Sequence, residues 1–120
     1  MLRILVVDDH DGMRKLIHFL LAANSFQICA EAEDGKQAVE LARELQPDVV
    51  ILDINMPNMN GLEAAPRIRV VAPSAKIVLL SMYLSPEAGE LQAARVQADA
   101  FVSKANAGVA LVPAIQQILH

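Results

Sequence analysis

The sequence predicts a doubly wound α/β domain, in which five helices cover a five-stranded parallel sheet with strand order 2-1-3-4-5. Short apolar runs alternate with helical patterns five times along the 120 residues. Such alternation is typical of parallel strands joined by right-handed helical crossovers. The run 48–53 is apolar without alternation, which indicates a strand covered on both faces. The length fits one domain over residues 1–120.

The first half of the chain contains two strand–helix pairs. A Leu-, Ile- and Val-rich run at 2–7 predicts the first strand, and 27–32 predicts the second. A second helix is expected at 36–45, because Pro47 ends the pattern. Asp11 is expected to cap the first helix, whose inward face repeats at helical spacing in Met13, Leu16, Ile17, Leu20 and Leu21.

The second half is expected to hold three more pairs. Their order is strand 48–53, helix 61–71, strand 76–80, helix from Pro86, strand 98–103 and a last helix running toward His120. Ser85 and Pro86 form a helix start, with a Ser cap and a proline at the first position. Pro66 conflicts with the pattern because it falls inside the third helix. Pro113 is expected in the first turn of a shorter last helix that begins near Val112.

Composition excludes several classes of protein. Apolar residues make up 54% of the chain, which is enough to bury a core and excludes disorder. The net charge of −4 argues against a DNA-binding face. No apolar run reaches the roughly 18 residues of a membrane span. Two acids directly after the first strand, without a small-residue cleavage site, predict a cytoplasmic protein. The single cysteine, Cys29, excludes an internal disulfide.

Polar side chains are expected to converge at one edge of this sheet. In an open parallel sheet, sites form at the carboxyl ends of the strands, near the reversal of strand order. The residues at these ends are Asp8, Asp9, Asp53, Ser81 and Lys104. Three carboxylates in one pocket repel one another unless a cation joins them. A hard divalent ion such as Mg²⁺ accepts such oxygens and favours phosphate as a further ligand.

These residue types suit transfer of a phosphoryl group to a carboxylate. Asp53 is the best nucleophile, because it lies at the tip of a central strand and enters an irregular loop. Asp8 and Asp9 would hold the metal, one directly and one through water, and Asn55 would add its main-chain carbonyl. Ser81 would donate a hydrogen bond to a phosphoryl oxygen. Alone, an Asp at a strand end is more simply a cap or a turn former, a Ser is a cap, and a Lys is solvated; their convergence at strand ends favours the functional interpretation.

The other polar residues are interpreted as structural. Asp34 and Asp99 have no converging partners and are expected in turns. His10 and His18 are interpreted as structural or surface residues, since their spacing gives no clear pair of metal ligands.

Four separated segments carry a family resemblance. They read V-V-D-D-H, D-V-V-I-L-D-I-N-M-P-N-M-N-G-L-E, I-V-L-L-S and F-V-S-K. In order and spacing they resemble the receiver domain of bacterial two-component response regulators, the CheY-like superfamily with a flavodoxin-like fold. The resemblance covers essentially the whole chain. V-D-D-H, A-E-A-E-D-G and L-S-M-Y are most similar to receivers of LuxR/NarL-type transcription regulators.

The resemblance implies a signalling switch rather than an enzyme. It implies that Asp53 accepts a phosphoryl group from a sensor histidine kinase. It also implies that Mg²⁺ or Mn²⁺ is bound by Asp53, by Asp8 or Asp9, and by the carbonyl of Asn55.

Further positions match this family's switch. Ser81 matches its hydroxyl, Lys104 its active-site lysine and Phe101 its switch aromatic. Tyr83 and Asn55 match positions that tune the lifetime of the acyl phosphate. Met82 departs from the small residue often found there and is expected to narrow access to Asp53.

Three alternatives compete with this interpretation. A phosphatase of the haloacid-dehalogenase type needs a second Asp where Asn55 stands. A flavin- or nucleotide-binding module needs a glycine-rich loop where 9–12 reads Asp-His-Asp-Gly. A pseudo-receiver would act as a protein-interaction module without phosphorylation, which the intact acidic set and Lys104 disfavour.

The last 20 residues predict an interaction surface. LuxR/NarL-type regulators continue into a helix-turn-helix domain, and the sequence holds none. We therefore expect the chain to be either a stand-alone receiver or a fragment of a DNA-binding regulator. Between 100 and 119 the only formally charged residue is Lys104. We expect this excess of apolar residues to form a homodimer or partner interface, which a charged substitution such as Ile118→Glu would disrupt.

Overall fold

The computed structural model describes residues 1–119, and these residues have the predicted topology. Five parallel strands form one sheet in the order β2-β1-β3-β4-β5. The strands are β1 (Leu2–Val7), β2 (Phe26–Ala32), β3 (Val49–Asp53), β4 (Lys76–Ser81) and β5 (Ala100–Ser103). The helices are α1 (Asp11–Ala22), α2 (Gly35–Leu45), α3 (Gly61–Val71), α4 (Pro86–Arg95) and α5 (Ala107–Ile118), with a short 3₁₀ turn at Lys104–Asn106 before α5.

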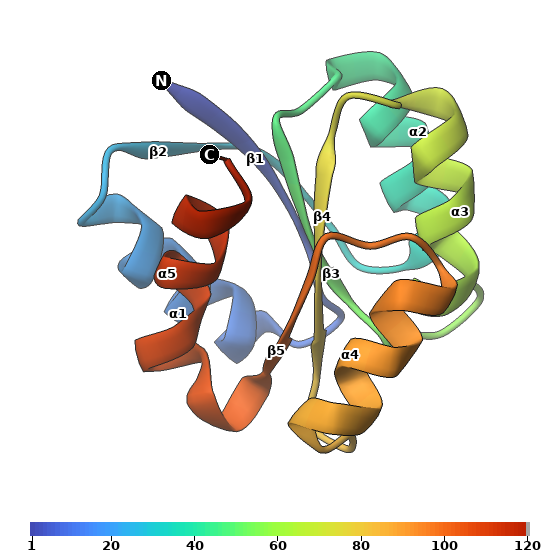
Figure 1. Cartoon of the computed structure of the whole chain (residues 1–120). Helices are drawn as coiled ribbons and strands as arrows, with labels where there is room; N and C mark the ends of the chain where they lie inside the picture. The colour runs from blue at the N-terminus through green and yellow to red at the C-terminus, as the bar shows by residue number, and fades with distance from the viewer. Residues whose placement is uncertain (120) are drawn as a thin grey trace.

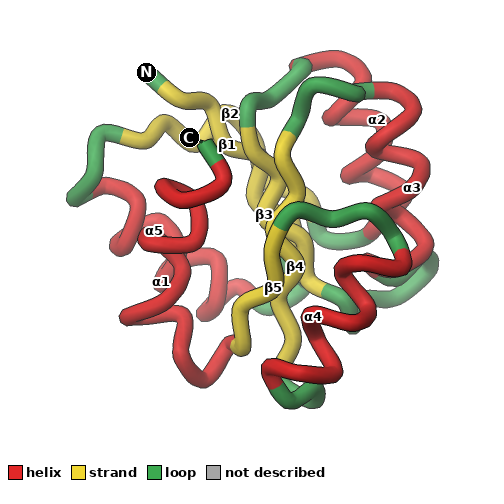
Figure 2. Tube along the Cα trace, viewed as in Figure 1, coloured by secondary structure: helices red, strands yellow, loops and turns green. Residues whose placement is uncertain are grey.

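Helices cover both faces of the sheet. Helices α1 and α5 lie on one face, and α2, α3 and α4 lie on the other (Figure 1). The strands run between these two layers (Figure 2). All five residues of β3 are buried, which confirms the prediction from its unbroken apolar run. Successive residues of β3 point into opposite cores: Val50 packs with the α2–α3–α4 layer and Ile51 with the α1–α5 layer.

The start of α1 differs from the prediction. Asp11 is the first helical residue, and His10 occupies the cap position without a side-chain cap. Asp11 instead pairs with Lys15 at a distance of 3.1 Å, one turn further on. Leu16, expected inside, is 40% exposed, whereas Ile17 and Leu21 are buried. The apolar stripe of α1 is therefore wider than the face that it buries.

Both prolines lie inside helices. Pro66 lies within α3, as expected, but the prediction of a short last helix from Val112 was wrong, because α5 begins at Ala107 and includes Pro113. The carbonyl that loses its helical partner to Pro113 belongs to Val109, which is 79% exposed. Water can hydrate that carbonyl, so a proline on the outer side interrupts the hydrogen bonds without ending the helix.

Other boundaries shift by one or two residues. The strand β5 begins at Ala100, two residues later than expected, and β4 extends to Ser81. The last helix, predicted to run toward His120, ends at Ile118 with Leu119 as its C-cap, and His120 lies outside the described residues. Within residues 1–119, no helix is both long and apolar enough to cross a membrane.

Candidate functional site

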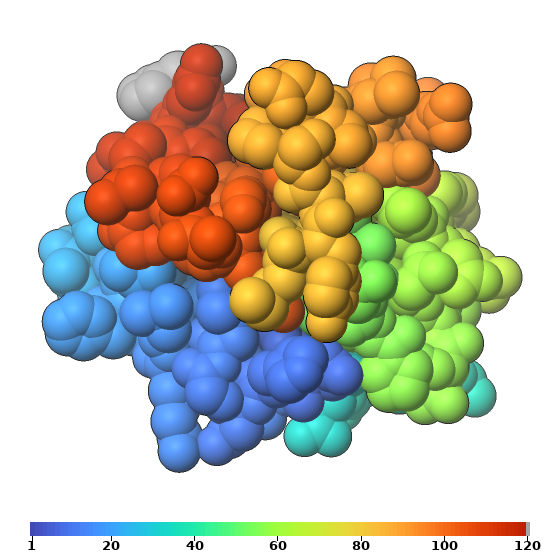
Figure 3. Space-filling view, turned by 90° about the horizontal axis from the view of Figure 1, so that it is seen from below, coloured from blue at the N-terminus to red at the C-terminus, as the bar shows by residue number. Residues whose placement is uncertain are grey.

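The carboxyl ends of four strands bring the predicted site residues together. Asp8 and Asp9 follow β1, Asp53 ends β3, Ser81 ends β4, and Lys104 follows β5. The strand order reverses between β1 and β3, because β2 is added on one side of β1 and the later strands are added on the other. Ligand sites of open parallel sheets are expected at this point. Figure 3 looks onto this end of the molecule, where the blue, green, yellow and orange-red segments that carry these residues meet.

Lys104 contacts two buried carboxylates. Its Nζ lies 2.8 Å from Asp8 Oδ2 and 3.1 Å from Asp53 Oδ2. The exposed fraction is 6% for the Lys104 side chain, 0% for Asp8 and 1% for Asp53. Two buried carboxylates share one ammonium group, so this group of three charges is not neutral by itself.

Burial and charge shift the pKa values of this cluster. Burial, reinforced by the nearby Asp8 carboxylate, raises the pKa of Asp53 from 3.8 to about 6, against the opposing attraction of Lys104. Burial alone would lower the pKa of Lys104, but Asp8 and Asp53 together raise it above 10.5. The lysine therefore stays charged at neutral pH. Keeping Asp53 ionised lowers the free energy of unfolding.

The acidic cluster fits a divalent cation. Ligand atoms of Asp8, Asp9, His10 and Asp53 all lie within 4.8 Å of one another. Asp8 Oδ2, Asp9 Oδ1 and Asp53 Oδ2 are buried and accept no hydrogen bond. Asp8 Oδ2 and Asp53 Oδ2 form ion pairs with Lys104, but their angles are not those of hydrogen bonds. With all three carboxylates ionised and Lys104 charged, two negative charges remain, which matches the charge and the oxygen preference of Mg²⁺ or Mn²⁺.

Ser81, Asn55 and Tyr83 form a hydrogen-bonded chain beside Asp53. The buried Ser81 hydroxyl donates to Asn55 Oδ1 at 3.3 Å and accepts from the Tyr83 backbone N–H at 3.1 Å. The Asn55 backbone N–H donates to Asp53 Oδ1 at 3.3 Å. The hydroxyl therefore already has partners and would exchange them to reach a phosphoryl oxygen.

A small cavity of about 150 Å³ opens onto Asp53. His10, Asn55, Met82, Tyr83 and Lys104 line its walls. Met82 is 66% exposed and Tyr83 is 81% exposed. Both exposed side chains therefore form part of the cavity wall beside solvent.

Two glycines allow close packing at the site. A β-carbon at Gly61, the first residue of α3, would overlap the backbone carbonyl of Asp53, so this helix can begin against the strand tip only with glycine. A β-carbon at Gly89 in α4 would overlap the ring of Phe101. The half-buried Phe101 ring therefore lies flush against the backbone of α4.

Three residues, His10, Arg14 and Asp34, make contacts at the site that were not predicted. His10 is exposed, in agreement with its interpretation as a structural or surface residue, but its Nδ1 lies 3.0 Å from Asp9 Oδ1. Arg14 donates to the backbone carbonyl of Asp8 at 2.6 Å and pairs with Glu31 at 3.1 Å, which fixes the loop after β1. Asp34 caps α2 and accepts from Asn58 Nδ2 at 3.0 Å, so this turn residue also holds the loop after β3. Of these, only the adjacency of His10 to the two acids is a signal visible in the sequence.

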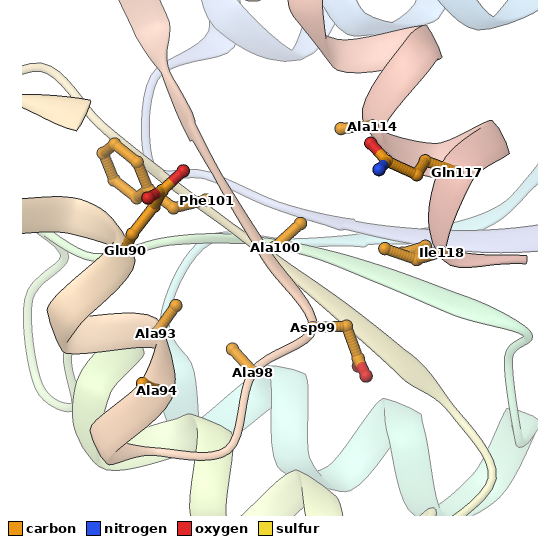
Figure 4. Close-up of a pocket in the computed structure, with 10 residues that line it drawn as sticks. All are labelled: Glu90, Ala93, Ala94, Ala98, Asp99, Ala100, Phe101, Ala114, Gln117 and Ile118. Atoms are coloured by element: carbon orange, nitrogen blue, oxygen red, sulfur yellow. The ribbon is translucent and has the colours of Figure 1, made fainter. Parts of the chain in front are cut away.

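A second hollow lies away from the acidic cluster, between α4, β5 and α5. Figure 4 shows this groove, which has a volume of about 480 Å³. Alanines from α4 and α5 line it, together with Ala100, Phe101 and Ile118. Glu90 and Asp99 supply its acidic groups. Because Phe101 lines it, the groove adjoins the residue that resembles the family's switch aromatic.

The chain thus combines a doubly wound parallel sheet with a lysine-bridged acidic cluster at the reversal of strand order. Residues 4–116 match the response regulator receiver domain family. The chain is 34% identical over 116 residues to the chemotaxis protein CheY of Thermotoga maritima, covering 97% of this chain and 96% of that protein.

Solved structures give the same result. A two-component response regulator of the LuxR family from Aurantimonas sp. is 33% identical with a TM-score of 0.90, covering 99% of this chain and 85% of that one. A DNA-binding response regulator of the LuxR family from Staphylococcus aureus is 30% identical with a TM-score of 0.89, covering 100% of both chains. The chain belongs to the response regulator receiver domain family of two-component signalling.

Proposed function

We propose that this receiver accepts a phosphoryl group on Asp53 from a sensor histidine kinase. The observation that carries the proposal is the buried Asp53 carboxylate, 3.1 Å from Lys104 and open to a cavity of about 150 Å³. An oxygen of Asp53 forms the new P–O bond while the P–N bond of the donor phosphohistidine breaks. The departing imidazole nitrogen takes a proton from solvent.

The surrounding residues have distinct roles in this proposal. Asp8, Asp9 and Asp53 hold the divalent cation, with the main-chain carbonyl of Asn55 as a further ligand. The cation, when bound, neutralises charge on the transferring group. Lys104 supplies a second positive charge to a phosphoryl oxygen.

Phosphorylation is proposed to change the surface formed by α4, β5 and α5. Ser81 leaves its bond to Asn55 and donates to the phosphoryl group, so the loop after β4 moves toward Asp53. Lys104 follows from the end of β5. Phe101, three residues before Lys104, changes its packing against Gly89. The phosphoryl group acts by favouring one of two pre-existing states.

Mass spectrometry tests the proposal. The chain is incubated with acetyl phosphate and Mg²⁺, and the intact mass is measured. We expect a single phosphoryl adduct that is absent in Asp53→Asn and retained in Asp11→Asn, which removes an exposed carboxylate outside the cluster. The absence of an adduct with every donor, including the cognate kinase, would instead make this chain a pseudo-receiver.

We further propose that the switched surface controls a DNA-binding output domain of the helix-turn-helix type. Support comes from the LuxR-family regulators that the chain resembles at 33% and 30% identity. Attaching such a domain to residue 120 gives a direct test, since DNA binding should then depend on phosphorylation of Asp53.

We also propose a homodimer through α5, but fewer of the apolar residues of this helix are free to form the interface than its composition indicated. Leu111 and Ile115 are buried in the core, and Ile118 packs partly against it. Val109 is 79% exposed. Ile118 also lines the groove between α4 and α5. Sedimentation of wild type and Ile118→Glu tests the dimer; a wild-type protein that is monomeric both with and without phosphorylation contradicts it.

A further inference from the structure

His10 contacts the acidic cluster through a different carboxylate oxygen from the one that Lys104 uses. Asp8 Oδ2 contacts Lys104 at 2.8 Å, while Asp8 Oδ1 lies 3.4 Å from His10 Nδ1. The same imidazole nitrogen lies 3.0 Å from Asp9 Oδ1. The His10 backbone N–H donates to Asp8 Oδ1 at 2.8 Å, which ties this residue to the cluster.

The cluster offers one more ligand atom beside its carboxylates. Asp9 Oδ1 is buried and accepts no hydrogen bond, and it faces the His10 nitrogen. Asp8, Asp9, His10 and Asp53 each offer one ligand atom within 4.8 Å of the others. The imidazole also lines the cavity that opens onto Asp53. A cation placed among the carboxylates would therefore meet a nitrogen donor as well as oxygens.

We propose that His10 is a nitrogen ligand of the divalent-cation site and makes the site bind transition-metal ions more tightly than its carboxylates alone would. This proposal rests on the cation site of the proposed function. Mg²⁺ prefers oxygen ligands and keeps several waters. Imidazole suits Co²⁺, Ni²⁺ and Zn²⁺, so His10 contributes to the affinity for these ions and little to that for Mg²⁺.

Metal titration separates these two effects. The whole chain is titrated with Co²⁺ and, separately, with Mg²⁺, as wild type and as His10→Ala. The matched control is His18→Ala, because His18 is exposed like His10 but pairs with Glu31 at 3.0 Å outside the cluster. We expect His10→Ala to weaken Co²⁺ binding by on the order of tenfold and to leave Mg²⁺ binding unchanged. His18→Ala should resemble wild type with both ions.

Pulsed electron paramagnetic resonance supplies a direct readout. With Co²⁺ bound, as in the titration, wild type and His18→Ala should show coupling to an imidazole nitrogen that is absent in His10→Ala. The proposal is overturned if wild type lacks this coupling, or if it persists in His10→Ala. Stronger Co²⁺ binding by His10→Ala would also overturn it, because the imidazole would then occupy the place of the cation. Equal weakening of Co²⁺ and Mg²⁺ binding would overturn it as well, because His10 would then only position the carboxylates.

The phosphorylation assay keeps the two proposals distinguishable. His18→Ala should form the phosphoryl adduct with Mg²⁺ as wild type does, since its side chain pairs with Glu31 outside the cluster. If wild type forms no adduct but shows the nitrogen coupling, the metal proposal stands and the phosphoacceptor proposal fails. If the adduct forms without nitrogen coupling, the reverse holds.

Discussion

Replacing Asp53 with asparagine should stabilise the protein at neutral pH. In the folded chain, burial and the neighbouring Asp8 carboxylate raise the pKa of Asp53 from 3.8 to about 6. The folded state at neutral pH therefore holds a charge that the unfolded chain ionises more easily. The asparagine side chain has nearly the same shape as aspartate and carries no charge, so Asp53→Asn removes this penalty.

The magnitude follows from the two pKa values. One pH unit corresponds to about 1.4 kcal/mol. The difference between 3.8 and about 6 therefore corresponds to roughly 3 kcal/mol of the free energy of unfolding at pH 7. This gain is an upper estimate, because the amide cannot form the ion pair with Lys104 and must direct its hydrogens in a buried site.

The sign depends on pH in a defined window. Between pH 4 and pH 6, about the two pKa values, the folded state binds more protons at Asp53 than the unfolded state does. The wild type therefore loses stability relative to Asp53→Asn as the pH rises through this window. Below about pH 4 both states are protonated, and the advantage of the variant disappears.

Urea unfolding in EDTA measures this difference at pH 4 and pH 7. Asp34→Asn is the opposite-sign control. The backbone hydrogen bond from Gln37 and the amide of Asn58 lower the pKa of Asp34, so this variant should lose stability at both pH 4 and pH 7, and the loss should fade only as the pH falls below 3.8. Saturating Mg²⁺ should reduce the advantage of Asp53→Asn, because only the wild type gains the full binding energy. A pH-independent difference, or a less stable Asp53→Asn at pH 7, would refute the reasoning.

Four further variants test other positions by urea unfolding at pH 7. Lys104→Met should destabilise the protein by about 3–5 kcal/mol, because two buried carboxylates lose the lysine that pairs with both; no loss would mean that the carboxylates are protonated. Arg69→Met should cost about 2–4 kcal/mol, because three acceptors lose its hydrogen bonds; a neutral effect would mean that water replaces them. Gly89→Ala should destabilise the protein by about 1–3 kcal/mol, because the added methyl group displaces the Phe101 ring. Gly108→Ala, which has open space around it, should stabilise the protein by about 0.5–1 kcal/mol. Equal effects of the two substitutions would refute the steric argument.

The sheet and the convergence of the site could be predicted because both follow from local patterns. An unbroken apolar run predicts a strand buried on both faces, and β3 is one. The carboxyl ends of parallel strands share one edge, so Asp8, Asp53 and Lys104 were expected to meet without knowledge of any distance. The contacts of 2.8 and 3.1 Å show that these three side chains do meet.

The predictions were wrong where the position of a residue in the folded structure, and not its local sequence, decides its role. Proline ends a helix by a local rule, but Pro113 lies on the outer side of α5 and the helix continues. Asp99 was expected only to form a turn, yet it accepts hydrogen bonds from Ile77 N–H and from Arg69. These partners lie 22 and 30 residues away, and no periodicity in the sequence connects them.

The apolar excess of the last helix shows the same limit. Its apolar residues predicted a surface as well as a core, but composition does not give the angle at which a helix meets a sheet. In the structure Leu111 and Ile115 enter the core, and neighbouring apolar side chains pack against its edge. Val109 remains 79% exposed. The groove beside Phe101 therefore supports the proposed output surface more strongly than composition does.

The cost of the buried Asp53 charge explains how a small group at the site could move distant residues. A cation or a phosphoryl group changes the electrostatic balance that holds Lys104 between Asp8 and Asp53. Lys104 directly follows β5, a strand of only four residues that also contains Phe101. Because the Phe101 ring lies against the backbone at Gly89, a shift of β5 must alter its contact with α4. Gly89→Ala should therefore change the response to phosphorylation as well as stability, whereas Gly108→Ala should change stability alone.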